Sequence, residues 1–250
     1  MSLGGTATVG ELGAPGVTKV MSENNPDHVE GSTVDASDAD GGSEMAGPRW
    51  LTDAPILAGQ LPEDVQRLLA RLLDEEPVET LDEWIEAVRR HTDGGPIGTE
   101  QLCHAGTPTP HWGELEGTRY HFSCFYDAVV LSALVDASVD VRTESPDGSI
   151  VTATAVGTEG LEVHPETAVF SFGVDEAVTP PDVDGPSAVD VYAAVCPYVR
   201  AFPHPDAYLQ WADDIPAATV AMPLQGATDV AAALVEKASE EATDDEFPDG

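Results

Sequence analysis

The chain has 250 residues, and its 46 acidic and 10 basic residues give a formal net charge of −36. This charge argues against direct binding of nucleic acid or of an anionic membrane surface, because the phosphates of both repel carboxylates. The acidic residues are spread over the whole chain, including segments with apolar periodicity, which indicates a surface adapted to concentrated salt, as in halophilic archaea.

The cysteines and the apolar runs bear on the cellular compartment. There are three cysteines, Cys103, Cys124 and Cys196, and an odd, small number does not suggest a disulfide framework. No apolar run approaches the ~20 residues of a membrane-spanning helix, and the N-terminus lacks the basic and apolar regions of a signal peptide. We therefore expect a reduced, cytoplasmic protein with no membrane partner.

The first half of the chain divides into a polar segment and a helical one. Residues 1–50 are rich in Gly, Ser, Asp, Glu and Asn with little periodicity, which predicts an acidic, disordered segment. Residues 51–117 are expected to form a helical, winged-helix-like subdomain followed by a loop. Its first helix has leucines at helical spacing after Pro62, and its second begins with a capping box of Thr80 and Glu83.

The second half is expected to form an α+β domain over residues 118–242, before an acidic tail at 243–250. After a loop over 101–117, an almost uncharged helix is predicted to begin with Ser123 as N-cap and to end near Val135. Alternating apolar runs predict a mostly antiparallel sheet with flanking helices. The predicted strands are 138–144, 149–156, 161–163, 168–172 and 218–221, and the predicted helices are 206–212 and 229–242.

Cys124 and Asp127 are the first candidates for chemistry. Residues three apart share one face of a helix, so the thiol and the carboxyl are expected to meet over one pocket. A cysteine in the first helical turn feels the positive end of the helix dipole, which favours the thiolate. The pair therefore predicts a nucleophile or soft-metal ligand beside a proton carrier, whereas a buried cysteine that only packs in the core is the simpler interpretation.

The other two cysteines carry weaker signals. Pro197 follows Cys196 and predicts that this cysteine lies outside the helical region, where a strand meets a turn. Cys103 has His104 beside it and His111 and His121 further on, but this spacing matches no standard zinc-ligand pattern. The sequence therefore leaves Cys103 without an assigned role, and Cys103→Ser is expected to be nearly silent.

The segment from His121 to Leu134, with Cys124 and Asp127 at the head of an apolar helix, resembles the organomercurial lyase (alkylmercury lyase) family. That family has Cys-x-x-Asp at this place and a second active-site cysteine later, before an aromatic-containing strand and a short helix with a Trp. Cys196, followed by Phe202 and Trp211, matches this order. The resemblance extends over about residues 55 to 240.

The resemblance implies an enzyme that cleaves the carbon–mercury bond by protonolysis and yields a hydrocarbon and Hg(II). Cys124 and Cys196 would be the mercury-binding thiolates, and Asp127 the proton carrier that stays close to the bound metal. No cofactor is implied; Hg(II) is held as the product, external thiols are needed for turnover, and mercuric reductase is a candidate Hg(II) acceptor.

Three alternatives remain open from the residues alone. The same thiolates suit a non-catalytic chaperone or sensor for Hg(II) or Cu(I). The cysteines could instead be inert in a structural or regulatory protein. A cysteine hydrolase would need a histidine base near Cys124, and His121 is the nearby candidate in the sequence.

Overall fold

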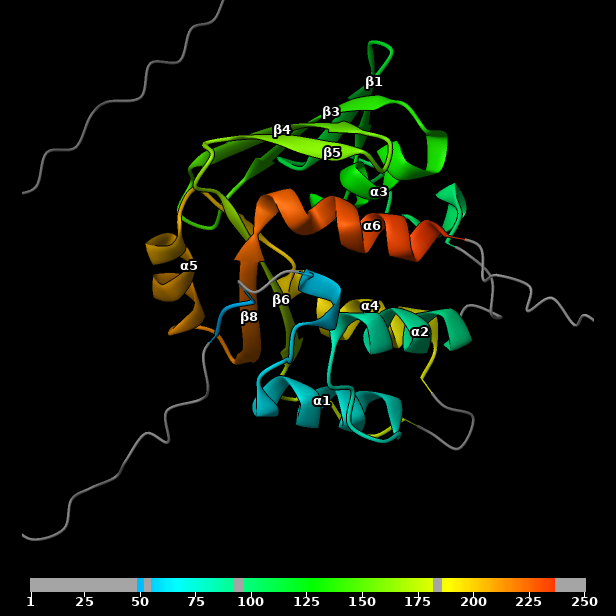
Figure 1. Cartoon of the computed structure of the whole chain (residues 1–250), viewed down its shortest axis with the longest axis vertical. Helices are drawn as coiled ribbons and strands as arrows, with labels where there is room; N and C mark the ends of the chain where they lie inside the picture. Colours follow the sequence, from blue (N-terminus) through cyan, green and yellow to red (C-terminus); the bar gives the residue numbers. More distant parts are fainter. Residues whose placement is uncertain (1–48, 52–54, 92–96, 182–185, 237–250) are drawn as a thin grey trace, which may run out of the picture. The chain divides into compact units, whose positions relative to one another are not determined.

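A computed structural model describes residues 49–51, 55–91, 97–181 and 186–236 (Figure 1). Its helices are η1 Ile56–Ala58, α1 Glu63–Leu73, α2 Leu81–His91, η2 Thr99–Gln101, α3 Tyr126–Val135, α4 Ala188–Val195, η3 Cys196–Tyr198, α5 Pro205–Ala212, η4 Leu224–Gly226 and α6 Ala227–Val235, where η marks a short 3-10 helix. Its strands are β1 Trp112–Leu115, β2 Thr118–His121, β3 Ser138–Glu144, β4 Ile150–Val156, β5 Gly160–His164, β6 Val169–Asp175, β7 Ala201–Phe202 and β8 Ala217–Pro223.

The strands form two antiparallel sheets, which confirms the predicted α+β class. The larger sheet has the order β2-β1-β3-β4-β5, and the smaller has the order β7-β6-β8. In β3 and β4 buried and exposed residues alternate, so one face of the larger sheet packs on the protein and the other faces solvent. In β6 and β8 nearly every residue is buried, so this pair lies in the interior and is covered on both faces.

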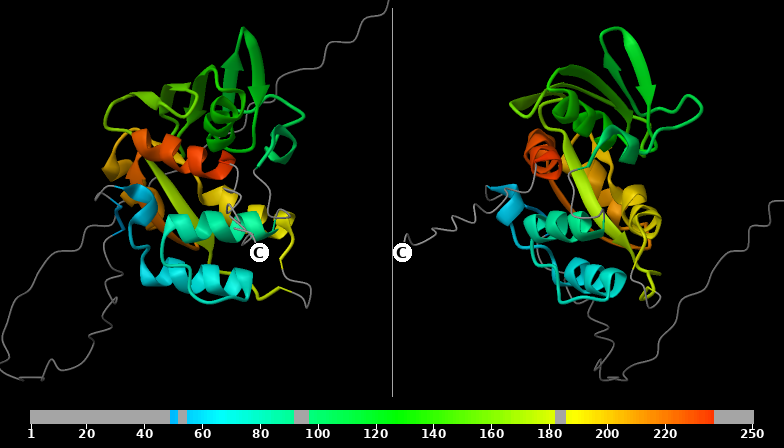
Figure 2. Two further views of the ribbon diagram at one scale, coloured as in Figure 1. Left: turned by 45° about the vertical axis from the view of Figure 1, so that its right-hand side comes forward. Right: turned by 90° about the vertical axis from the view of Figure 1, so that its right-hand side faces the viewer.

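Helices pack on both sheets (Figures 1 and 2). Helix α3 lies against β1, β3 and β4 of the larger sheet and against α6, and α6 in turn contacts α2. Helix α1 packs on β6 and β8, and α4 packs on β6. None of the helices in the described ranges is both long and apolar enough to cross a bilayer.

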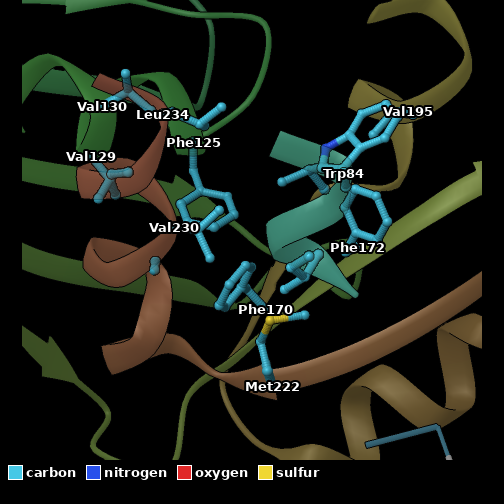
Figure 3. Packing of buried hydrophobic residues seen from close by; sticks show 14 of the residues in the cluster. Trp84, Phe125, Val129, Val130, Phe170, Phe172, Val195, Met222, Val230 and Leu234 are labelled. Carbon is cyan, nitrogen blue, oxygen red and sulfur yellow. The ribbon is translucent and has the colours of Figure 1, made fainter. Parts of the chain in front are cut away.

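One buried cluster joins the helices to the smaller sheet (Figure 3). The ring of Trp84 on α2 lies 5.5 Å from that of Phe172 on β6, and the ring of Phe125 lies 6.2 Å from that of Phe170. The predicted helical segment therefore shares its core with the second half of the chain. The proposed domain boundaries remain predictions, and the predicted terminal segments fall almost wholly outside the described residues.

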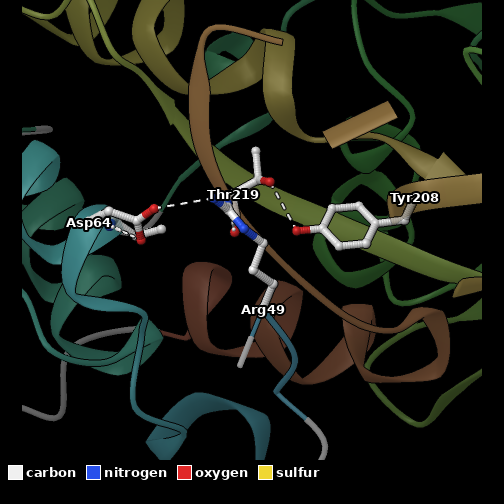
Figure 4. Close-up of polar contacts among 5 residues, drawn as sticks. Arg49, Asp64, Tyr208 and Thr219 are labelled. Carbon is white, nitrogen blue, oxygen red and sulfur yellow. Dashed lines mark hydrogen bonds and ion pairs between the residues drawn. The ribbon is translucent and has the colours of Figure 1, made fainter. Parts of the chain in front are cut away.

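The first described residues, 49–51, pair with strand β8. Trp50 forms a parallel bridge with Ala221, and the Arg49 guanidinium donates to the Thr219 carbonyl at 3.1 Å. The same guanidinium approaches the Asp64 carboxylate at 3.5 Å, as Figure 4 shows. These contacts join β8 to the start of α1.

Two local predictions are wrong. The expected loop over 101–117 contains β1, which pairs with β2 and β3 in the larger sheet. Ser123 is not the N-cap of α3; Phe125 holds that position, and the helix begins at Tyr126. Ser123 instead donates its backbone N–H to the Cys103 carbonyl at 2.9 Å, in the bend between β2 and the helix. Cys124 therefore precedes the helix.

The prediction for Cys196 is also wrong. Its backbone is helical, with φ −56° and ψ −34°, and it ends α4 and begins η3. A proline disfavours this conformation in the preceding residue without forbidding it. Pro197 here occupies the start of a new helical turn, where its missing N–H costs no hydrogen bond.

The predicted cap of α2 by Thr80 is confirmed, whereas the Glu83 carboxylate bonds to the residue before Thr80 and not to Thr80 itself, as a full capping box would require. The Glu83 N–H donates to the Thr80 hydroxyl at 3.2 Å, and the Glu83 carboxylate accepts from the Glu79 N–H at 2.7 Å. Thr80→Ala should lower the free energy of unfolding by about 1 kcal/mol, because the cap is lost. Urea unfolding in molar salt measures this. Thr80→Ser keeps the hydroxyl and should remain near wild type; equal losses in both variants would contradict a capping role.

Candidate active site

Cys124 and Asp127 are held between the end of β2 and the start of α3. After β2 the strand pairing continues at Phe122, whose N–H donates to the His111 carbonyl at 3.0 Å, and the chain bends over residues 123–125. Helix α3 then begins, with Asp127 in its first turn. The Cys124 thiol donates to the Asp127 carboxylate, with an Sγ to Oδ2 distance of 3.5 Å. The structure thus brings this pair together, as the sequence predicted.

Cys196 reaches the same place from the opposite half of the chain. Its thiol hydrogen-bonds with those of Cys124 and Cys103. The turn that carries it is fixed on β6, because the Ser171 hydroxyl donates to the Tyr198 carbonyl at 2.7 Å. Three thiols, those of Cys103, Cys124 and Cys196, therefore form one group, which we call the thiol cluster.

Cys103 is the member that the sequence left unassigned. Residues 103–105 run antiparallel beside 121–123, and the Ala105 N–H donates to the His121 carbonyl at 2.8 Å. This pairing places Cys103 next to Cys124, and the Cys103 backbone N–H also donates to the Asp127 carboxylate. No sequence signal points to the pairing, because the segment is proline-rich and too short to show strand periodicity.

The thiol cluster opens on a cavity of about 110 Å³ whose surface is almost entirely apolar. Helices α2, α3, α4 and α6 and strand β6 contribute to its wall. Besides the three cysteines and Asp127, its lining residues are Leu81, Trp84, Val88, Ile97, Gln101, Leu102, Tyr126, Val130, Phe170, Ser171, Phe172, Val191, Tyr192, Val195, Val199, Val230 and Leu234. Such a cavity has room for a small apolar group and little to hold water.

Burial governs the ionisation of Asp127. Loss of hydration raises the pKa of this carboxyl from 3.8 to about 6, and the hydrogen bonds from Cys124 and from the Cys103 backbone offset only part of that rise. A pKa near 6 allows the group both to accept and to release a proton near neutral pH.

Hydrogen bonds between the thiols shift the pKa values of Cys103 and Cys196 in opposite directions. The bond from Cys196 lowers the pKa of Cys103, because it stabilises the Cys103 thiolate. The pKa of Cys196 is raised by its bonds to Cys103 and Cys124 and by burial, because this thiol keeps its proton as the donor. The free cluster therefore holds a thiolate at Cys103 more readily than at Cys196.

A second polar group supports the Cys196 turn. The Arg200 guanidinium donates to the Pro197 carbonyl at 2.9 Å and lies 3.2 Å from Nε2 of His111, whose Nδ1 is 2.6 Å from the Thr143 hydroxyl. Burial, together with the charge of Arg200, lowers the pKa of His111 to about 4, so the ring stays neutral. The group links the larger sheet to the Cys196 turn.

The histidines weighed as zinc ligands with Cys103 have other partners, and Nε2 of His104 lies 3.0 Å from the Thr99 carbonyl oxygen. His111 is bound to Thr143 and Arg200, and Nδ1 of His121 lies 3.1 Å from both the N and the O of Thr109. Across the described ranges, no three His, Cys, Asp or Glu side chains form a ready-made metal-ion site.

Thiols and one carboxyl at the wall of an apolar cavity are the groups that suit a soft metal bound to an apolar group. Residues 105–236, just over half of the chain, match the family model described as alkylmercury lyase. The alkylmercury lyase of Streptomyces lividans is 28% identical over 185 residues, which cover 72% of this chain and 79% of that protein. The alkylmercury lyase of Bacillus cereus is 31% identical over 116 residues, which cover 45% of this chain and 48% of that protein.

Among solved structures, the mercury-bound form of MerB2 aligns over 70% of this chain and 91% of its own, with 16% identity and a TM-score of 0.39. The family match shows that the chain belongs to the alkylmercury lyase family. The resemblance read from Cys124, Asp127 and Cys196 is thereby confirmed at the level of the family, and the non-catalytic chaperone or sensor is not favoured.

The raised pKa of Asp127 predicts how this residue affects stability. Folding raises the pKa from 3.8 to about 6, so the folded protein binds more protons than the unfolded chain between these values, and stability falls as the pH rises through them. Asp127→Asn removes this cost. It should raise the free energy of unfolding by up to about 3 kcal/mol at pH 7 and by much less at pH 4.

Denaturant unfolding of Asp127→Asn in molar salt at both pH values provides the measurement. Asp214→Asn, which changes an exposed carboxylate, is the matched control and should shift stability little at either pH. Destabilisation by Asp127→Asn at pH 7 would show that the buried carboxylate is stabilised by its hydrogen bonds rather than penalised by burial.

Proposed function

We propose that the chain cleaves the carbon–mercury bond of organomercurials, with Cys124 and Cys196 as mercury-binding thiolates and Asp127 as the proton carrier. The observation that carries this assignment is the meeting of both thiols and the carboxyl at one apolar cavity, in a chain of the alkylmercury lyase family.

Capture of the metal comes first. Mercury is soft, so sulfur binds it far better than oxygen or nitrogen does. The Cys124 sulfur displaces the original ligand of R–Hg⁺, and the thiol proton passes to the Asp127 carboxylate at 3.5 Å. Cys196 then binds as the second sulfur, and its thiol proton passes to the Cys103 thiolate, to which it is hydrogen-bonded. The second sulfur donates electron density to mercury, and this density shifts onto the carbon and prepares it to accept a proton.

Protonolysis completes the reaction. The carbon receives the proton from Asp127 as the carbon–mercury bond breaks, so that R–Hg⁺ and H⁺ give R–H and Hg²⁺. The pKa of about 6 suits this exchange, because the carboxyl is basic enough to take the thiol proton and acidic enough to return it. Hg(II) remains on both sulfurs, with the carboxylate beside it.

The apolar cavity supports a small alkyl or aryl group as R. Aromatic and aliphatic side chains such as Trp84, Phe172 and Val230 line it, and their contact with the hydrocarbon excludes water from the reacting bond. The same apolar wall gives the site a low dielectric constant. The electrostatic interactions that accompany proton transfer are therefore stronger there than in water.

Turnover needs an acceptor for Hg(II). External thiols, with mercuric reductase as a candidate acceptor protein, fit this role, since only sulfur competes with the bound thiolates. The excess of acidic residues supports adaptation to concentrated salt and argues against a nucleic-acid or anionic-membrane partner. The cytoplasmic location stays a prediction from the small, odd number of cysteines and the lack of a signal-peptide pattern.

Each catalytic group has its own expected loss. Cys124→Ser and Cys196→Ser should each abolish turnover, because one sulfur does not both hold and activate mercury. Asp127→Asn should keep mercury binding and slow hydrocarbon release by ~10²–10⁴, the usual contribution of a general acid. Headspace gas chromatography over protein, methylmercury and excess small thiol in molar salt measures methane directly. Near-normal methane from either cysteine variant would rule out the two-thiolate mechanism.

Salt dependence tests the proposed adaptation. With a net charge of −36, the folded chain repels itself in dilute buffer, and salt screens that repulsion. The free energy of unfolding should therefore rise steeply between ~0.1 M and molar KCl. Circular dichroism during urea unfolding at several KCl concentrations follows the effect. Full stability in dilute buffer would contradict the adaptation while leaving the lyase chemistry untouched.

A further inference from the structure

The three members of the thiol cluster differ in how far they lie from solvent. Cys124 is buried, with 5% of its surface exposed, whereas Cys196 and Cys103 are partly exposed. Cys196 stands between the other two, because its thiol hydrogen-bonds with both. Cys196 therefore forms one pair with Cys124 and a second pair with Cys103.

The described residues favour binding by two of these sulfurs at a time. No ready-made site of three or more ligating side chains exists in the described ranges, and Hg(II) forms its strongest complexes with two thiolates. Two pairs are available from the same cysteine, Cys124 with Cys196 and Cys103 with Cys196. The catalytic mechanism proposed above uses the first pair and leaves the second without a function.

We propose that Cys103 is an exit thiol, which takes Hg(II) over from Cys124 while Cys196 keeps hold of the metal. This proposal rests on the proposed lyase function, because it concerns the fate of the product. In the transfer, a bond forms between mercury and the Cys103 sulfur as the bond to the Cys124 sulfur breaks. The proton of the Cys103 thiol passes to the Cys124 sulfur, so charge and atoms balance and no oxidation state changes.

The position of Cys103 suits this step. Its backbone carbonyl accepts from the Ser123 N–H at 2.9 Å, so the segment that carries it is anchored directly beside Cys124. Its backbone N–H donates to Asp127, which lies within reach of the Cys124 thiol and can relay the transferred proton. An external thiol would meet Hg(II) at the partly exposed pair rather than at the buried Cys124.

The test removes the first pair and asks whether the second binds mercury. Full-length Cys124→Ser is mixed with one equivalent of HgCl₂ in molar salt, challenged with a small thiol and desalted, and retained mercury is measured. The two controls are Cys103→Ser/Cys124→Ser and Cys124→Ser/Cys196→Ser, each with a single sulfur left in the cluster. X-ray absorption at the mercury edge counts the bound sulfurs, and circular dichroism checks the fold.

We expect Cys124→Ser to hold Hg(II) through two sulfurs and to retain it against thiol at least about tenfold better than either double variant, a difference of about 1.4 kcal/mol. Retention no better than that of the double variants would overturn the proposal. Cys124→Ala, which adds no hydroxyl, repeats the test if the serine variant fails to fold.

A kinetic measurement separates this proposal from the lyase chemistry. The sequence alone predicts a nearly silent Cys103→Ser, but the place of Cys103 in the thiol cluster changes this expectation. In Cys103→Ser, the steady-state rate of methane release at limiting external thiol should fall about tenfold relative to the first-turnover rate. Cys103→Ala should behave in the same way, because both variants lack the sulfur. An unchanged ratio would contradict the exit role. Absence of methane from the unmodified chain would instead refute the proposed catalysis, and the mercury-retention result would still decide whether Cys103 and Cys196 form a binding pair.

Discussion

The short antiparallel pairing of residues 103–105 with 121–123 is the constraint on which the candidate site depends. It holds the backbone of residues 121–123 against the neighbouring segment, and helix α3 begins only at Tyr126. That start leaves Cys124 ahead of the helix and puts Asp127 in its first turn. The same hydrogen bonds bring Cys103 to the cluster. A few backbone contacts thus assemble groups from separate segments, while β6 and α4 bring Cys196 from the other side.

The carboxyl of Asp127 shows how the cavity and the chemistry depend on each other. An apolar wall is needed to hold a hydrocarbon and exclude water, and the same wall makes an ionised carboxylate costly. Hydrogen bonds from Cys124 and from the Cys103 backbone reduce this cost but leave the pKa well above its usual value. The protein therefore carries an unfavourable buried group at the point where the proposed reaction requires a transferable proton.

Much of the fold could be predicted from the sequence, because its signals are local. The hairpin of β3 and β4 follows from alternation around Pro146–Gly148, and the cap at Thr80 follows from residue types at fixed spacing. The Cys-x-x-Asp spacing likewise predicted the contact between Cys124 and Asp127. Strand β1 was missed because four residues are too few for a period to show, and its pairing with β3 spans a long stretch of chain.

The participation of Cys103 could not be predicted for a related reason. Its place in the cluster depends on non-local hydrogen bonds made by a proline-rich segment, and those leave no repeat in the sequence. The helical backbone of Cys196 was missed because the steric rule for a residue before proline is a preference, and packing of α4 against β6 overrides it.

The wall of the cavity has one consequence for how the sequence of such a protein diverges during evolution. Helix α2 supplies Leu81, Trp84 and Val88 to the cavity but none of the thiols or the carboxyl. Part of the wall that sets the shape of the cavity is thus carried by an element that holds none of the reactive groups. Under the proposed mechanism, substitutions on α2 alter the volume offered to a hydrocarbon without altering the groups assigned to its cleavage, so the range of organic groups accepted is free to diverge while the chemistry stays constant.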